Sequence, residues 1–207
     1  AAVFSVVRVE SLNTIPLYAA YFMIFYSAAV LFRNPKTIKL VLVAIIISTL
    51  ILSFLGIYQY FFVKIPTAQA WVDAQQFPEL STRVYATLEN PNVLGEYLGL
   101  AIPLLVGFFW ASDKFRHKLS LAVVICILAV CLILTFSRGA WLGLAVSAFI
   151  FAKIKESRLL VLFIILALVA PMFLPPVVIN RIASIGSLED SSNAYRITIW
   201  IAALRMI

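Results

Sequence analysis

The sequence predicts an all-α fold, a polytopic transmembrane helical bundle with about six spans. Of its 207 residues, 64% are hydrophobic and only 12% are charged, and the mean hydropathy is +1.06. A soluble domain is usually about 45–50% apolar and about 25% charged. A chain of this length cannot bury so many apolar side chains in a core of its own, so it requires lipid as solvent.

Six apolar stretches supply the predicted spans, since a helix crosses a bilayer with about 20 residues. In chain order they are 12–32, 40–63, 93–111, 119–136, 140–152 and 159–174. The fourth and fifth form one run that, as a single helix, would reach about 51 Å against a hydrocarbon core of about 30 Å. We therefore expect the chain to turn back at Ser137-Arg138-Gly139, with Arg138 at the tip of a tight hairpin.

The basic residues predict the orientation. The loops 33–39, 112–118 and 153–158 each hold three lysines or arginines. Because basic loops favour the cytoplasmic side, we expect these three there and the alternate loops outside. The net charge of +7 then reflects membrane topology and not binding of nucleic acid.

The chain is interpreted as one transmembrane domain, 1–207, truncated at both ends, because it starts at Ala1 and stops inside an apolar stretch. Segment 64–92 is predicted to be an external loop, and 175–207 the start of a large external loop.

Two arginines on the predicted outer side are candidates for chemistry. Arg138 lies between apolar arms, where a guanidinium is costly unless paired, and its planar fork of donors matches phosphate oxygens. The alternative is an arginine that reaches water from the hairpin tip, with Trp141 as an interface anchor. Arg196 is expected in the first turn of a helix, where a cation gains nothing from the helix dipole. It then needs an anionic partner, such as a ligand or Asp190, unless it is an ordinary surface arginine.

Asn90-Pro91-Asn92 leads into the third span. Asparagine and proline favour turns and caps, and we expect Asn92 to be the N-cap, which alone would account for the motif. Glu96 lies one turn inside the span, where the helix N-terminus favours a carboxylate. It could also pair with an arginine, and Arg83 is the nearest in sequence.

The remaining chemistry-bearing residues point to no soluble-type active site. His117, the single histidine, lies in a basic loop predicted to be cytoplasmic, and Cys126 and Cys131 are interpreted as buried inert thiols. The sequence has no Ser-His-Asp set, no metal-ligand cluster and no glycine-rich phosphate loop. We therefore expect neither a metal nor a cofactor.

Three stretches resemble the O-antigen ligase and O-antigen polymerase family. Residues 135–143, TFSRGAWLG, resemble its signature hairpin, and 83–98, with Asn90-Pro91-Asn92, resemble the segment that precedes it. Tyr195-Arg196 with Trp200 is similar to the opening of the family's large external loop. The three occur in the expected order.

This resemblance implies a membrane glycosyltransferase at the outer face of the bacterial cytoplasmic (inner) membrane. It would move a glycan from an undecaprenyl-diphosphate carrier to a sugar hydroxyl, on lipid A core in ligases or on another lipid-linked glycan in polymerases. Arg138 and Arg196 would be the catalytic residues, which bind the donor diphosphate and stabilise the leaving group. Substrate binding is assigned to five further residues: Arg83, Asn90, Asn92, Glu96 and Ser137.

The resemblance also implies a histidine base in the external loop, which we expect beyond Ile207, so that this stretch alone would be inactive. Two other classes of membrane protein would show different features. A transporter or channel would favour discontinuous helices, inverted repeats and ionisable groups near the midplane, whereas the charges here cluster at loop ends. A non-catalytic membrane scaffold would give the external arginines no role.

Overall fold

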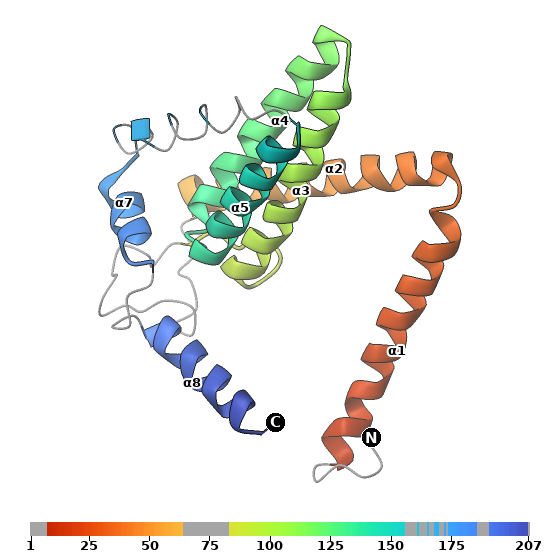
Figure 1. Ribbon diagram of the computed structural model, residues 1–207, viewed down its shortest axis with the longest axis vertical. Helices are drawn as coiled ribbons and strands as arrows, with labels where there is room; N and C mark the ends of the chain where they lie inside the picture. Colours follow the sequence, from red (N-terminus) through yellow and green to blue (C-terminus); the bar gives the residue numbers. More distant parts are fainter. Residues whose placement is uncertain are drawn as a thin grey trace. The chain divides into compact units, whose positions relative to one another are not determined.

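Every regular element that the structure describes is a helix, as the sequence predicts (Figure 1). The chain divides into two compact units, Ala1–Ile45 and Ile46–Ile207, and each is taken by itself below. In this computed structural model the described residues are 8–63, 83–155, 161, 165, 168–169, 172, 174–185 and 191–206, the side chains of 8, 10, 11 and 191–196 excepted.

The first unit holds α1 (Arg8–Leu31) and the beginning of α2 (Pro35–Tyr58). Asn34 begins α2, because its side chain accepts a hydrogen bond from the Lys36 backbone N–H at 3.0 Å, and proline suits the first helical position. Large apolar side chains such as Phe22 and Phe25 are 68% and 70% exposed. Such a surface requires a lipid environment. Pro16 lies inside α1, which begins before the apolar run does.

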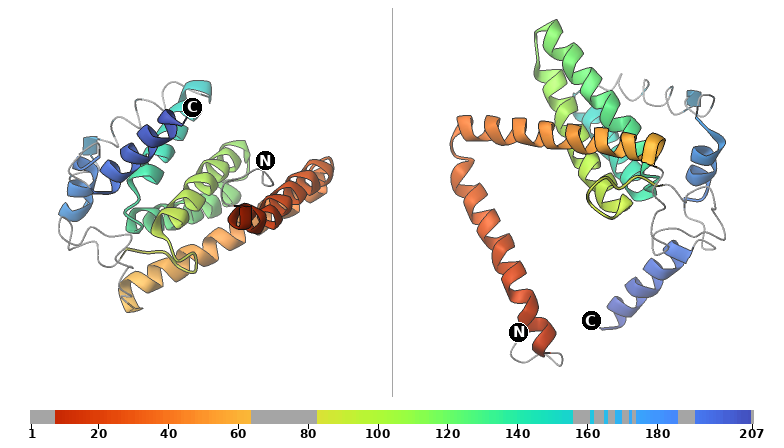
Figure 2. Two further views of the ribbon diagram at one scale, coloured as in Figure 1. Left: turned by 90° about the horizontal axis from the view of Figure 1, so that it is seen from below. Right: turned by 180° about the vertical axis from the view of Figure 1, so that it is seen from behind.

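The second unit is built around α3 (Pro91–Ala111), which packs against both α4 (Phe115–Leu134) and α5 (Arg138–Lys155) (Figure 2). The part of α2 from Ile46 onward, with its last π-helical turn η2 (Gln59–Val63), packs on the same core. The core consists mainly of aliphatic side chains: Val84, Leu94, Leu98, Leu105, Leu128 and Leu132.

The connection between α4 and α5 differs from the expected tight hairpin. The chain turns at 135–137, with Phe136 in the left-handed region at φ 51°, and Arg138 is already the first residue of α5. The two helices contact each other only slightly and instead share α3 as their packing partner. Gly95 of α3 has no side chain, which lets the turn and the start of α5 approach α3 closely.

Four described helical segments are long and apolar enough to cross a membrane: Leu12–Leu31, Pro35–Val63, Pro91–Ala111 and Phe115–Leu134. They match the first four predicted spans, so the chain is a multi-pass membrane protein, and the count of six is approximate. α5 forms where the fifth span was expected, has 18 residues and ends on Lys153 and Lys155. The sixth expected span, 159–174, lies largely outside the described residues.

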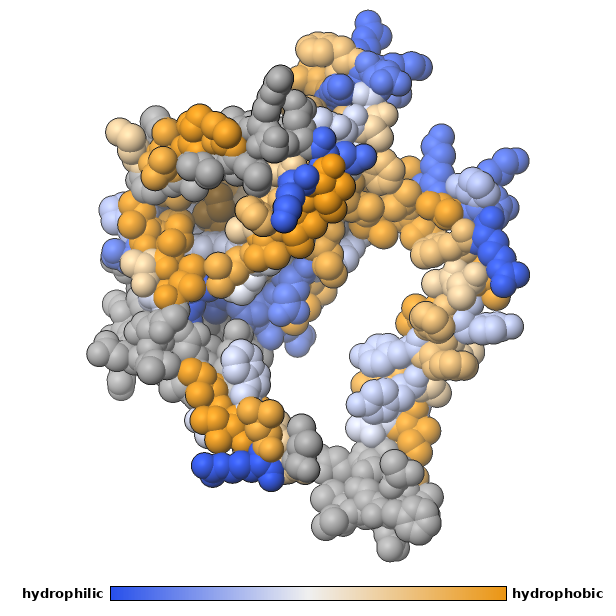
Figure 3. Space-filling view, viewed as in Figure 1, coloured by the Kyte–Doolittle hydropathy of each residue, from blue (hydrophilic) through white to orange (hydrophobic). Residues whose placement is uncertain are grey.

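Short connections place the polar groups of the second unit at two ends. Residues 112–114 join α3 to α4 at one end, where Lys114, Arg116 and Lys118 lie, and α5 finishes at the same end with its lysines. Hydrophilic side chains gather at this α3–α4 connection (Figure 3). The first residues of α3, the 135–137 turn and the first residues of α5 share the opposite end. This arrangement agrees with the predicted alternation of basic and less basic loops.

Two further helices, α7 (Pro176–Ala183) and α8 (Ser191–Arg205), lie in the segment expected to begin the large loop. α7 packs through Val178 against Phe136 of the α4–α5 turn. It therefore joins the end of the unit that holds the Ser-Arg-Gly sequence.

Candidate functional site

Arg83 is buried at this end, with only 3% of its surface exposed. Its Nε donates a hydrogen bond to the Thr135 carbonyl oxygen at 2.9 Å, and its Nη2 donates to Asn92 Oδ1 at 2.8 Å. The next backbone N–H, that of Val84, donates to the Leu134 carbonyl oxygen at 3.2 Å. A buried charge is tolerated only when hydrogen-bonded. Arg83 thus ties the segment before α3, and α3 itself, to the α4–α5 turn.

The N-cap of α3 is Asn90, not Asn92 as expected. The Asn90 side chain accepts from the Asn92 backbone N–H at 2.9 Å, and Pro91 occupies the first helical position. The correction follows from proline, which favours the position directly after the cap. Asn92 lies inside the first turn of α3, where its side-chain oxygen accepts from Arg83.

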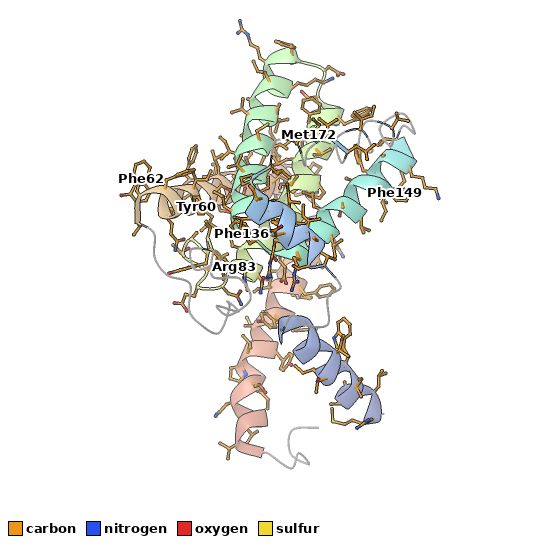
Figure 4. All side chains as sticks on the ribbon, turned by 90° about the vertical axis from the view of Figure 1, so that its left-hand side faces the viewer. Tyr60, Phe62, Arg83, Phe136, Phe149 and Met172 are labelled. Carbon is orange, nitrogen blue, oxygen red and sulfur yellow. The ribbon has the colours of Figure 1, made fainter. Side chains whose placement is uncertain are left out.

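Ser137 meets α3 at Gly95. A Cβ on Gly95 would lie 2.8 Å from Ser137 Cβ and 3.1 Å from Ala140 Cβ. Ser137 itself is buried, and its backbone N–H donates to Thr135 Oγ1 at 3.3 Å. The structure therefore gathers four of the predicted site residues around the 135–137 turn: Arg83, Asn90, Asn92 and Ser137 (Arg83 and Phe136 are labelled in Figure 4).

Arg138 begins α5, partly buried, and contacts the end of α7. Its Nη1 donates to the Ser184 carbonyl oxygen at 2.8 Å and to Ser184 Oγ at 3.1 Å. Ser184 is the C-cap of α7, and a helix C-terminus carries partial negative charge. A cation at the first position of α5 interacts unfavourably with that helix's own dipole. The C-terminus of α7 offsets this cost and orients the guanidinium.

Two predicted site residues are not joined to this cluster by the described contacts. Glu96 is exposed on α3, and among the described side chains no ion pair links it to Arg83, which bonds to Asn92 and Thr135 instead. Arg196 lies in α8, beyond its first turn because the helix begins at Ser191. The side chain of Arg196 lies outside the described residues.

Sequence reasoning missed Gln59, Arg181 and Ser184. Arg181 is only 8% exposed, three residues after Val178 on the same face of α7. The Ser184 hydroxyl donates to the Arg181 carbonyl oxygen at 2.9 Å. The spacing of Val178 and Arg181 could have indicated one buried face, but nothing in the sequence indicates what that face packs against.

The remaining candidates lie apart from the cluster. His117 is exposed at the basic end of the second unit. Cys131 is buried, but Cys126 is exposed on α4, so the interpretation of both as buried thiols was wrong for Cys126. In the part of the chain that the structure describes, no group of three metal-ligating side chains comes together.

The comparison with protein families follows the same residues. Residues 121–207 match the O-antigen ligase family. The match confirms the resemblance seen in the sequence, and it covers most of α4, the 135–137 turn with Arg138, and the helix of Arg196. The chain is thus a multi-pass membrane protein whose residues 121–207 are similar to the O-antigen ligase family. No curated protein and no solved structure matches it significantly. Arg83, which precedes the matched residues, is bonded directly to them.

Proposed function

We propose that this protein is a membrane glycosyltransferase that moves a glycan from an undecaprenyl-diphosphate carrier to a sugar hydroxyl, at the outer face of the bacterial cytoplasmic membrane. The observation that carries the proposal is the setting of Arg138. It lies in the residues that match the O-antigen ligase family, and at the end of α3–α5 away from the basic residues 114–118. Its guanidinium is oriented by Ser184.

The reaction needs fixed positive charge at this place. The acceptor oxygen attacks the anomeric carbon of the donor glycan, and the bond from that carbon to the diphosphate oxygen breaks. The lipid diphosphate leaves with the bonding electrons, so negative charge develops on it. Guanidinium groups of Arg138 and Arg196 would bind that diphosphate and stabilise it, because preorganised cations act strongly in a site with little water. The hydroxyl proton would pass to a base, for which the family resemblance implies a histidine in the external loop.

The other site residues would act around these two arginines. Arg83, Asn90, Asn92 and Ser137 hold one another or the 135–137 turn, which supports a role in shaping the donor site. Glu96 is exposed one turn into α3, so its carboxylate is available to accept hydrogen bonds from sugar hydroxyls.

The test is Arg138→Ala in the full-length protein, with glycan transfer measured per amount of protein in the membrane. We expect transfer to be abolished and membrane insertion to be retained. Arg138→Lys should recover little, because an ammonium cannot reproduce the planar fork. Arg116→Ala, an exposed arginine at the basic end, is the matched control and should transfer normally. Normal polysaccharide output from Arg138→Ala would exclude this arginine from the site and end the proposal.

A further inference from the structure

The side-chain amide of Gln59 is buried and takes no direct part in the proposed reaction. It is the first residue of η2, at the end of α2, and 7% of its surface is exposed. Its Oε1 accepts hydrogen bonds from two consecutive backbone N–H groups, that of Tyr85 at 3.3 Å and that of Ala86 at 3.0 Å. Single π-helical turns recur at functional sites. This one places the amide against the segment that precedes α3.

The two N–H groups belong to a strained piece of backbone. Ala86 has φ 51° and Glu89 has φ 60°, both in the left-handed region that non-glycine residues rarely adopt. Each such residue costs about 1–3 kcal/mol and persists only where its surroundings enforce it. The Gln59 oxygen supports the conformation at Ala86, because it accepts from the Tyr85 and Ala86 N–H groups together.

The strained segment is the one that carries Arg83. Arg83 lies three residues before Ala86, and its guanidinium bonds to Thr135 of the α4–α5 turn and to Asn92 of α3. Tyr60, the residue next to Gln59, packs on Phe136 of the same turn (Figure 4). η2 therefore touches the turn directly through Tyr60 and indirectly through Gln59 and Arg83.

We propose that Gln59 is a positioning residue for the donor site. Its side-chain oxygen fixes the segment 83–90, so that Arg83 can hold the 135–137 turn and with it the start of α5, where Arg138 lies. Gln59 itself does not touch substrate. This inference rests on the proposed function, because positioning matters only if Arg138 acts on the donor.

The surroundings of the Gln59 amide nitrogen indicate that the side-chain oxygen, and not the nitrogen, makes the structural contacts. Nε2 is buried, and no described residue accepts a hydrogen bond from it. An unpaired buried donor costs about 1–3 kcal/mol, so this nitrogen does not explain why an amide occupies the position. The oxygen, with its two donors, does.

The experiment compares Gln59→Met with Gln59→Glu in the full-length protein. Methionine has similar length and no strong acceptor, whereas glutamate keeps an oxygen for both N–H groups. We expect Gln59→Met to lower the transfer rate about 10- to 100-fold, the effect of a misplacement of about 1 Å, and Gln59→Glu to restore most of it. Phe62→Met, at an exposed position of the same turn, is the control and should transfer like the unmodified protein.

Two further readouts separate positioning from general destabilisation. Amide hydrogen exchange at Tyr85 and Ala86 should speed up in Gln59→Met and stay slow in Gln59→Glu. Arg83→Met combined with Gln59→Met should lose no more activity than the worse single variant, because residues acting through one relay are not additive. If the activity losses of the two single variants multiplied in the double variant, the two residues would act independently, and the inference would be overturned.

Wild-type transfer by Gln59→Met, or Gln59→Glu no better than Gln59→Met, would also overturn it. The Arg138→Ala variant distinguishes failure of the positioning role from failure of the proposed function. An inactive Arg138→Ala with an active Gln59→Met removes only the positioning role, whereas an active Arg138→Ala removes the proposed function.

Discussion

Gly95→Ala is the substitution that most sharply separates the packing of the site from the stability of the protein. Gly95 is buried in α3, and a Cβ there would lie 2.8 Å from Ser137 Cβ and 3.1 Å from Ala140 Cβ. Carbon atoms in contact prefer about 3.5–4.0 Å. The α4–α5 turn would therefore have to withdraw from α3 by roughly 1 Å.

The magnitudes of the two effects differ. Overpacking costs about 1–3 kcal/mol, and replacing glycine by alanine in a helix returns about 0.8–1 kcal/mol. The net loss of folding free energy is then roughly 0–2 kcal/mol, which a folded protein usually survives. Misplacement of a catalytic group by 1 Å costs about 10²-fold in rate. We expect Gly95→Ala to be folded and inserted but to transfer glycan about 100-fold more slowly.

Two glycines of the same helix provide matched controls. A Cβ on Gly99 would have its nearest neighbour, the Ala140 carbonyl oxygen, at 3.8 Å, and a Cβ on Gly107 would meet nothing within 4 Å. Gly99→Ala and Gly107→Ala should keep full transfer and gain slightly in thermal stability. The assay is the initial rate of glycan transfer in membranes, divided by the amount of inserted protein. If Gly95→Ala transferred glycan as fast as Gly107→Ala, the close approach of α3 to the turn would not be needed for transfer.

Three further experiments test two contacts of the site and the topology. Arg83→Met leaves the buried Thr135 carbonyl oxygen and the partly buried Asn92 side chain without their donor. It should lower the free energy of unfolding by about 1–3 kcal/mol, seen as a lower melting temperature in detergent, and an unchanged melting temperature would contradict a stabilising role of these bonds. Asn90→Ala should cost about 1 kcal/mol through loss of the α3 N-cap, while Asn90→Asp should keep it, and equal melting temperatures for the two would argue against the cap. Gly139→Cys should react with a membrane-impermeant thiol reagent from outside and Arg116→Cys should not; the opposite labelling pattern would reverse the topology.

The helices could be predicted from the sequence because their cause is local. Long apolar runs in lipid must satisfy their backbone hydrogen bonds internally, which leaves the helix as the natural solution. The residues at which helices begin and end were harder to predict, as the N-cap of α3 shows. Both asparagines suit a cap chemically, and only the preference of Pro91 for the first helical position selects Asn90.

The contacts of the site could not be predicted, because they join residues far apart in sequence. Arg83 and Thr135 are 52 residues apart, and Arg138 and Ser184 are 46 apart. No periodicity or local propensity encodes such a pairing. The sequence did indicate that Arg138 needs an acceptor, since a guanidinium near lipid must be paired. It could not indicate that the C-terminus of α7 supplies one.

The central claim is that Arg138 and Arg196 hold one diphosphate, and affinity for the donor tests it most directly. The measurement is the dissociation constant of the full-length protein for an undecaprenyl-diphosphate-linked glycan, compared among the unmodified protein, Arg138→Gln, Arg196→Gln and the double variant. A charge-assisted hydrogen bond is worth about 1.5–3 kcal/mol, so each single variant should bind at least about tenfold more weakly. The double variant should lose less than the product of the two. Unchanged affinity in either single variant would contradict the claim.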